Sequence, residues 1–192
     1  MKLGRAAMVA YTEYARDPRV RRYAECLTRN GYEVDCFVLK KANNIQIDVI
    51  NGVKIFHLKT SQYRGNSNLA YIYSYFTFFI QALIALTKQI HNNYSVIHVH
   101  NMPDFLVFTT LINKLFGSKV ILDIHDNMPE LYKTKFDSKI GVLLYHILLA
   151  QERLSCFYAD RVITVHVPHF EYNVKNHNLS PNKTFIIPNF AD

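Results

Sequence analysis

The segment Lys119-Val-Ile-Leu-Asp-Ile-His-Asp126 gives the clearest indication of how this chain folds. Residues 119–124 form a short and nearly continuous apolar run, which is typical of a strand buried on both faces at the centre of a parallel sheet. Polar side chains follow at once, at His125 and Asp126. Ligands of open α/β sheets bind outside the carboxyl ends of the strands. The segment therefore predicts a parallel sheet with a ligand site at that edge.

The rest of the chain repeats this alternation of short apolar runs and longer helical patterns. Such alternation predicts βαβ units and a doubly wound, Rossmann-like α/β fold with a mostly parallel sheet. We expect strands near residues 6–11, 33–39, 45–50, 52–58, 95–100, 119–124, 161–165 and 184–187, and helices near residues 18–30, 69–90, 104–116, 140–158 and 170–176. The dipeptide Asn51-Gly52 predicts a hairpin turn between two of these strands.

The composition is that of one globular domain. The chain has 192 residues, of which 49% are hydrophobic and 19% charged, so a buried core is expected and wholesale disorder is not. Cys26, Cys36 and Cys156 share no metal-ligand spacing and are interpreted as reduced thiols. Residues 1–10 lack the apolar region of a signal peptide. We therefore expect a single domain over residues 1–192 in the cytoplasm.

The net charge of +7 favours anionic partners, which are nucleic acid, lipid headgroups or phosphorylated ligands. The sequence has no long Lys/Arg block and no helix-turn-helix, zinc-finger or RNA-binding signature. We therefore expect no nucleic-acid partner.

The first strand is followed by an arginine-rich helix start, Asp17-Pro18-Arg19-Val20-Arg21-Arg22, and by no GxGxxG or Walker A pattern. Asp17 suits the N-cap and Pro18 the first helical position. Arginines in a first turn oppose the helix dipole, unless an anion lies nearby. Two interpretations fit equally well, a phosphate- or carboxylate-binding corner formed by Asp17, Arg19 and Arg22, or a solvated face.

The next polar cluster is His98-Val-His100-Asn101-Met102-Pro103-Asp104. His98 and His100 are two residues apart on a strand and point to the same face. Their spacing matches no metal signature, so we expect no metal. His100 and Asp104 flank the carboxyl end of a strand and are candidate ligand-binding residues. His98 is interpreted as a hydrogen-bonded core histidine.

The third cluster extends the opening segment to Glu130. A histidine, acids and an amide crowd the mouth of the sheet between Asp123 and Glu130. Histidine exchanges protons or donates hydrogen bonds near neutral pH, and a carboxylate beside it orients a hydroxyl or tunes the imidazole. We favour a ligand site here, with His125 and Asp126 as candidate catalytic residues and Glu130 as a candidate acceptor- or phosphate-binding residue. The alternative is a simple helix N-cap at Asp126 or Asn127.

Residues 69–90 form a long apolar segment, but they include Tyr71, Ser74, Gln81 and Lys88. A spanning helix needs about 20 predominantly apolar residues. We expect a helix that covers the sheet and is buried in the core. The lesser alternative is an aromatic face that touches a membrane surface, which would place the protein peripherally on the inner face of the cell membrane.

Five segments together resemble the N-terminal domain of family 4 GT-B glycosyltransferases. They cover nearly the whole chain and occur in the family's order: residues 17–34, 96–101, 123–130, 159–165 and 186–192. Residues 159–165 read ADRVITV, and residues 186–192 read IIPNFAD, which is similar to the string that closes this domain in the family.

The resemblance implies the acceptor-binding half of a retaining enzyme. Such an enzyme transfers a sugar from a UDP- or GDP-linked donor to a glycan or lipid-linked acceptor, usually in cell-envelope or surface polysaccharide synthesis. By motif match, His125 lies near the reacting sugar and donor phosphate, and Arg19 and Arg22 lie near the interdomain cleft. Members of the family need no bound metal, and this domain alone binds no cofactor.

The chain departs from the family pattern in three ways. Residues 12–16 replace the usual glycine-rich loop, which weakens the case for phosphate binding there, and His166 replaces a serine. We also expect the C-terminal donor-binding domain to be absent from this chain, which would leave it little or no turnover. One alternative is a stand-alone binding or scaffolding subunit that recruits an acceptor or a partner chain. Another is a different Rossmann-like ligand-binding domain or hydrolase, against which the missing nucleophile-elbow motif counts.

Overall fold

A computed structural model describes residues 3–41, 45–65, 67–126, 129 and 139–188. Within these residues, eight strands form one sheet in the order β3-β4-β2-β1-β5-β6-β7-β8. The strands are β1 (Gly4–Val9), β2 (Tyr32–Val38), β3 (Ile47–Ile50), β4 (Val53–His57), β5 (Val96–His100), β6 (Lys119–Ile124), β7 (Arg161–Thr164) and β8 (Thr184–Ile186). Every pairing is parallel except β3 with β4.

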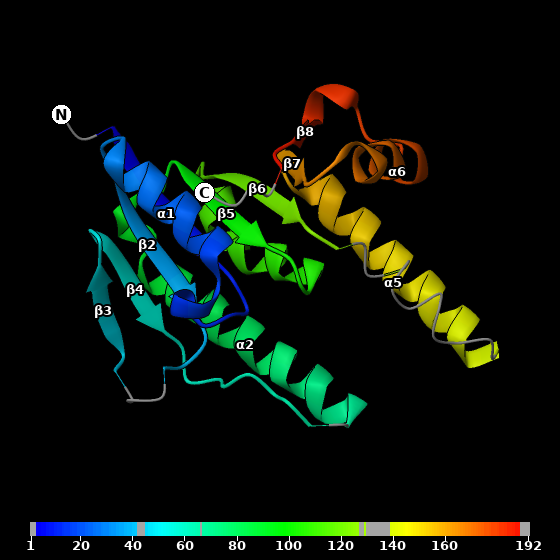
Figure 1. Cartoon of the computed structure of the whole chain (residues 1–192), viewed down its shortest axis with the longest axis horizontal. Helices are drawn as coiled ribbons and strands as arrows, with labels where there is room; N and C mark the ends of the chain where they lie inside the picture. The colour runs from blue at the N-terminus through cyan, green and yellow to red at the C-terminus, as the bar shows by residue number, and fades with distance from the viewer. Residues whose placement is uncertain (1–2, 42–44, 66, 127–128, 130–138, 189–192) are drawn as a thin grey trace.

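Helices cover both faces of this sheet (Figure 1). They are α1 (Pro18–Arg29), α2 (Asn68–Lys88), α3 (Leu111–Leu115), α5 (Lys139–Tyr158) and α6 (Val167–His177). Alternate residues of β1 and Ala10 after it show the two layers, because Ala7 and Val9 join the core beneath α2, whereas Met8 and Ala10 join the core beneath α1. The prediction of a doubly wound, mostly parallel α/β fold is confirmed.

Local signals in the sequence fix several element boundaries. The Asp17 side chain caps α1 by accepting hydrogen bonds from the backbone N–H groups of Arg19 and Val20, both at 3.1 Å. Asn51 and Gly52 have φ values of 51° and 81° and form the predicted turn between the antiparallel strands β3 and β4. These boundaries could be predicted because each rests on one residue type at one position.

The helix predicted over residues 104–116 is replaced by a 3-10 helix over Asp104–Thr110 and the short helix α3. The hydroxyls of Thr109 and Thr110 donate to the carbonyls of Leu106 and Val107, three residues earlier, both at 2.7 Å. Such local side-chain bonds compete with a regular α-helix.

Helix α2 packs on the sheet, as predicted, but the prediction that it is buried in the core is wrong. Phe78, Ala82 and Leu86 are fully buried against the sheet. The outward face is also apolar and is exposed at Leu69, Ile72, Tyr73, Phe76, Ile80 and Ile84. We call these six residues the outer stripe of α2.

Candidate functional site

A pocket of about 210 Å³ lies at the carboxyl edge of the sheet, where the chain order reverses between β1 and β5. The chain leaves β1 toward β2 and β4 on one side and later returns to build β5 to β8 on the other side. Such switch points leave a crevice in which ligands bind. We call it the switch-point pocket. Its lining is Ala10, Tyr11, Thr12, Asp17, Arg19, Gln62, Tyr71, Tyr75, His100, Asn101, Met102, His125 and Asp126.

A buried carboxylate, Asp123, lies behind this pocket with three histidines around it. His100 Nδ1 is 3.1 Å and His98 Nε2 is 3.4 Å from Asp123 Oδ2, and His125 Nε2 is 3.0 Å from Asp123 Oδ1. All three nitrogens are thus within 3.4 Å of a carboxylate oxygen of Asp123. We call these four residues the histidine–aspartate cluster.

The register of the sheet explains why this cluster forms. His100 pairs with Asp123 across β5 and β6, and His98 is two residues earlier on the same face of β5. The rings of His98 and His100 stack at 4.2 Å between centroids, and the Tyr23 ring of α1 lies 5.0 Å from that of His98. The predictions that His98 and His100 share a face and that His98 is buried in the core are confirmed. The predicted hydrogen bond of His98 is not found at its Nε2 among the described residues.

Burial and mutual contact set the charges in the cluster. Burial lowers the pKa of His100 to about 4, with His98 acting in the same direction and Asp123 opposing it. Burial would raise the pKa of Asp123, but contacts with His100, His125 and His98 outweigh burial and hold the pKa well below its usual range. Near neutral pH, an ionised Asp123 therefore lies against a neutral His100.

Asn101 holds the loop after β6 in place. Its Oδ1 accepts a hydrogen bond from the backbone N–H of His125 at 2.9 Å. Its Nδ2 donates to the backbone carbonyl of Asp126 at 2.7 Å and to Asp104 Oδ1 at 3.1 Å. Asn101 thus fixes the two residues predicted as catalytic, His125 and Asp126, which both line the switch-point pocket.

The arginines of α1 have different surroundings. Arg19 lines the switch-point pocket, its side chain is 20% exposed, and its Nε is buried without a hydrogen-bond partner among the described residues. Arg21 is more exposed and lies 4.0 Å from Glu25, as expected on a solvated face. Arg22 is half-buried and does not line the pocket in the part of the chain that the structure describes. Of the two equal interpretations, anion binding fits Arg19 and the solvated face fits Arg21.

Asp17 lines the same pocket, but both of its α1 hydrogen bonds are capping bonds. The amide groups that it occupies belong to the first turn of the helix, which is where a phosphate would otherwise bind. Arg19 Nη2 lies 3.9 Å from Asp17 Oδ2. Arg19, rather than the helix terminus, is therefore the candidate anion-binding group of this corner.

Asp104 lies below the pocket and is fully buried. Its carboxylate accepts hydrogen bonds from Asn101 and, at 3.2 Å, from Gln151 Nε2 of α5. Burial, together with the nearby Glu152, raises the pKa of Asp104 to about 7. Asp104 is not among the described residues that line the switch-point pocket. Glu130, the last predicted site residue, lies outside the described residues.

His98, His100 and Asp123 are also the residues that could hold a metal ion. Their ligand atoms lie within 4.8 Å of one another, and all three residues are buried. Two imidazoles and a carboxylate are a ligand set that zinc accepts. Our expectation that the site works without a metal stays a prediction.

The fold and the pocket together define the N-terminal lobe of a GT-B protein. Residues 19–192 match the model of Glycosyltransferase Family 4, so the chain belongs to that family. A comparison with curated proteins gave no significant match.

Two solved structures with the same fold illustrate how the chain compares in length. Sucrose-phosphate synthase from Thermosynechococcus elongatus has a TM-score of 0.70 at 17% identity, with 96% of this chain and 48% of that chain covered. Phytolacca americana UGT2, complexed with UDP-2fluoro-glucose and pterostilbene, has a TM-score of 0.62 at 12% identity, with 98% and 54% covered. The chain thus spans about half the length of these two structures.

Sequence reasoning missed the roles of Asp123 and Asn101. Both residues stand inside quoted motifs, but their importance depends on which face each side chain takes. The alternation of side chains along β6 could have indicated the role of Asp123. Leu122 and Ile124 face one core cluster, so Asp123 between them points to the opposite face of the sheet.

Proposed function

We propose that the chain is the acceptor-binding lobe of a retaining glycosyltransferase that uses a UDP- or GDP-linked sugar donor. The observation that carries the proposal is that His125, Asp126, His100 and Arg19 line one pocket at the switch point of a family 4 chain. The donor would bind a second lobe. The acceptor would be a glycan or a lipid-linked sugar in cell-envelope or surface polysaccharide synthesis.

The chemistry expected of this pocket is positioning and charge stabilisation. His125 is held by the ionised Asp123, so its ring is fixed before substrate arrives. With Nε2 facing Asp123, the doubly protonated ring would donate a hydrogen bond from Nδ1 to the reacting sugar or to the departing diphosphate. Arg19 would stabilise the same negative charge, and Asp126 would orient a sugar hydroxyl. Closure of the two lobes would exclude water.

The test is sugar transfer by the full-length polypeptide with a panel of UDP- and GDP-sugars. His125→Ala should lower kcat by roughly 10²- to 10⁴-fold, the range for a group that stabilises a transition state or transfers a proton. The matched control is His91→Ala, because His91 is an exposed histidine just before β5, at the opposite edge of the sheet. Equal activity of the two variants would refute the role of His125, and no transfer from any donor would refute the enzyme.

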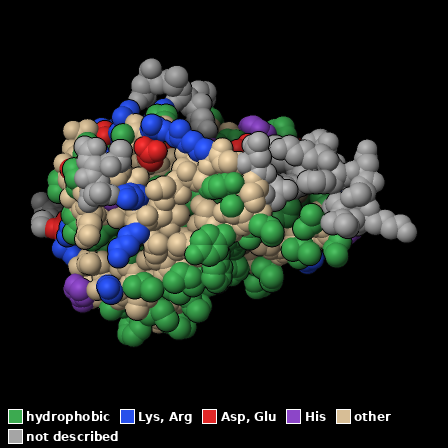
Figure 2. Space-filling view, turned by 90° about the horizontal axis from the view of Figure 1, so that it is seen from below, with side chains coloured by type: hydrophobic (Ala, Val, Ile, Leu, Met, Phe, Trp, Pro, Cys, Tyr) green, Lys and Arg blue, Asp and Glu red, His purple; other side chains and the backbone are tan. Residues whose placement is uncertain are grey.

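We also propose that the protein docks on the inner face of the cell membrane through the outer stripe of α2. Within the described residues, one helix, Leu69–Lys88, is long and apolar enough to cross a bilayer, and 28% of its most apolar window is buried. Its buried side packs on the sheet, so the helix would lie along the surface. Figure 2 shows hydrophobic side chains gathered along one side of the molecule, with Lys and Arg side chains beside them.

A bilayer suits this surface better than a second protein because the net charge of +7 also favours anionic headgroups. The test is flotation of the chain with phosphatidylglycerol vesicles at low salt. Phe76→Ser, on the outer stripe, should reduce binding, whereas Val49→Ser, at a similarly exposed apolar residue of β3, should not. Failure of the unaltered chain to float would refute the proposal, as would self-association of the chain through this face.

A further inference from the structure

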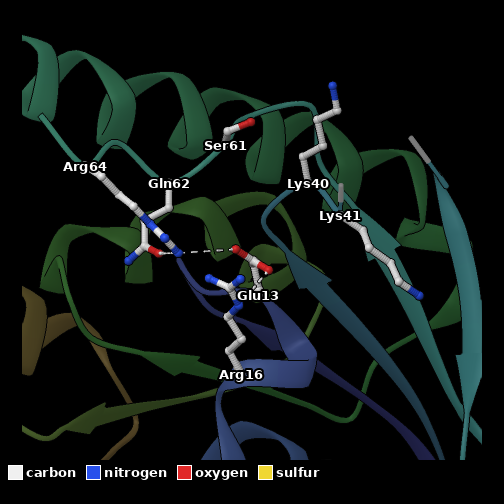
Figure 3. A pocket seen from close by; sticks show the side chains of 7 residues that line it. All are labelled: Glu13, Arg16, Lys40, Lys41, Ser61, Gln62 and Arg64. Atoms are coloured by element: carbon white, nitrogen blue, oxygen red, sulfur yellow. Dashed lines mark hydrogen bonds and ion pairs between the residues drawn. The ribbon is translucent and has the colours of Figure 1, made fainter. Parts of the chain in front are cut away.

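A second and larger pocket adjoins the switch-point pocket. It measures about 390 Å³ and shares Gln62 with its neighbour. This volume is in the usual range for small-molecule sites, roughly 300–1,000 Å³. We call it the basic pocket, and Figure 3 shows its lining: Glu13, Arg16, Lys40, Lys41, Ser61, Gln62 and Arg64.

Two arginines share one carboxylate at the centre of the basic pocket. Glu13 lies 3.3 Å from Arg16 Nε and 3.8 Å from Arg64 Nη2, and both guanidinium groups point toward it in Figure 3. The arginine side chains are 59% and 65% exposed. Long and exposed ion pairs of this kind hold their partners weakly. Both guanidinium groups can therefore turn to an incoming anion at little cost.

Two lysines stand at the other end of the pocket, with their side chains turned outward (Figure 3). Lys41 Nζ is 2.8 Å from Asp48 Oδ2. Lys40 is exposed and forms no ion pair with any residue that the structure describes. Four cationic side chains and one carboxylate line the pocket, which is an excess of three positive charges, and Asp48 outside the lining offsets the charge of Lys41.

The surroundings of the basic pocket extend this charge in two directions. On one side, Gln62 leads into the switch-point pocket with His125. On the other side, Ser61, Gln62 and Arg64 belong to the segment that enters α2, whose outer stripe starts at Leu69. Helix α2 itself contributes Tyr71 and Tyr75 to the switch-point pocket. A ligand with a polar reactive end, an anionic group and an apolar tail would match these three surfaces.

We propose that the basic pocket binds a phosphate or diphosphate group of the acceptor, with the acceptor's apolar chain lying along the outer stripe of α2. This inference rests on the proposed function and names the acceptor class, an amphipathic sugar phosphate. Arginine forks and lysine ammonium groups are the side chains that bind phosphate oxygens. Glu13 holds the two guanidinium groups near the site before the anion arrives and opposes the anion once it binds.

The first measurement is calorimetric titration of the chain with inorganic diphosphate at low salt. Arg16→Gln and Lys40→Gln should each raise Kd roughly tenfold or more, the effect of losing one charge-assisted hydrogen bond. Glu13→Gln should lower Kd, because it removes the opposing charge. The matched control is Lys175→Gln, which removes an exposed lysine of α6 and should leave Kd unchanged. Equal Kd values for Arg16→Gln, Lys40→Gln and Lys175→Gln would overturn the proposal.

The second measurement separates a lipid-linked phosphate from a free one. Farnesyl diphosphate should bind at least roughly tenfold more tightly than inorganic diphosphate, because its chain would bury apolar surface. Phe76→Ser should remove this gain without changing the affinity for inorganic diphosphate, whereas Lys40→Gln should weaken both ligands alike. Equal affinities for the two ligands in the unaltered chain would overturn the lipid-linked acceptor and leave a soluble phosphate as the ligand.

Turnover separates this proposal from the proposed function. In the full-length enzyme, Lys40→Gln should raise KM for a lipid-linked acceptor and leave kcat and the donor KM unchanged, whereas His125→Ala lowers kcat. An unchanged acceptor KM in Lys40→Gln, with transfer intact, would refute the basic pocket alone. Diphosphate binding without transfer from any donor would refute the glycosyltransferase alone.

Discussion

The charged side chains at the two neighbouring pockets differ in their burial and in how closely their charged partners surround them. Behind the switch-point pocket, Asp123 is fully buried and has three histidine nitrogens within 3.4 Å. In the basic pocket, Glu13 has two arginines at 3.3 and 3.8 Å, and both are largely exposed to solvent. The first arrangement fixes geometry in advance, whereas the second can change partners.

This difference matches two tasks. Stabilising a transition state requires groups that are already in position, because reorganisation during the reaction would add to the barrier. Binding an anionic group requires attraction and the ability to release the product. A buried cluster suits the first task and a loose, exposed one suits the second.

The largest expected effect is on stability at the buried cluster. Asp123→Asn removes the charge against which three histidines pack and should lower the free energy of unfolding by about 2–4 kcal/mol. Urea denaturation at pH 7 measures this loss. The control is Asp48→Asn, because Asp48 forms an ion pair with Lys41 at the protein surface. Similar denaturation midpoints for the two variants would mean that the histidine–aspartate cluster contributes no more to stability than a surface ion pair does.

A smaller effect should appear in the pH dependence of stability. The pKa of His100 is lowered to about 4, so the folded state resists protonation and its stability falls as pH drops below the unfolded value. The pKa of Asp104 is raised to about 7 by burial and by Glu152, so its contribution is lost as pH rises toward 7. Between about pH 4 and pH 7, a falling pH therefore lowers stability through His100 and raises it through Asp104.

Asp104→Asn should separate the two contributions. Without the carboxyl group, the effect of His100 is no longer opposed, and the free energy of unfolding should fall by about 2–3 kcal/mol more than that of the unaltered chain between pH 6.5 and 4.5. Urea midpoints at several pH values measure this difference. His100→Gln should leave the effect of Asp104 unopposed, so the free energy of unfolding should rise, relative to that of the unaltered chain, as pH drops from 6.5 to 4.5. Parallel pH profiles of Asp104→Asn and the unaltered chain would contradict this account.

The buried half of this comparison could be predicted in part from the sequence. The apolar run over residues 119–124 placed β6 at its observed bounds, and the position of polar residues after it indicated a ligand edge. Strand periodicity also put His98 and His100 on one face. The face taken by Asp123 depends on the layer that each strand residue joins, and the motif alone did not reveal that Asp123 joins the histidines.

The basic pocket, which is the exposed side of this comparison, could not be predicted from the sequence. Residues 13 and 16, 40 and 41, and 61 to 64 come from three connections that are far apart in the sequence, and no motif links them. They meet because β1 and β2 are adjacent in the sheet and the segment before α2 passes over their carboxyl ends. The outer stripe of α2 was likewise hidden, because a helix that is apolar on all sides does not reveal which side faces the core.

The smallest expected effect is on stability at the basic pocket. It tests whether the exposed ion pairs of Glu13 are as weak as their geometry indicates. Arg16→Gln breaks an exposed pair and should change the free energy of unfolding by less than about 1 kcal/mol, as is typical of surface ion pairs. Urea denaturation with and without saturating inorganic diphosphate measures both its stability and its ability to be stabilised by an anion. Diphosphate should stabilise the unaltered chain more than the variant, because only ligands bound to the folded state shift unfolding. A stability loss in Arg16→Gln as large as that of Asp123→Asn would make the pocket a structural ion-pair cluster, and the contrast between the two pockets would fail.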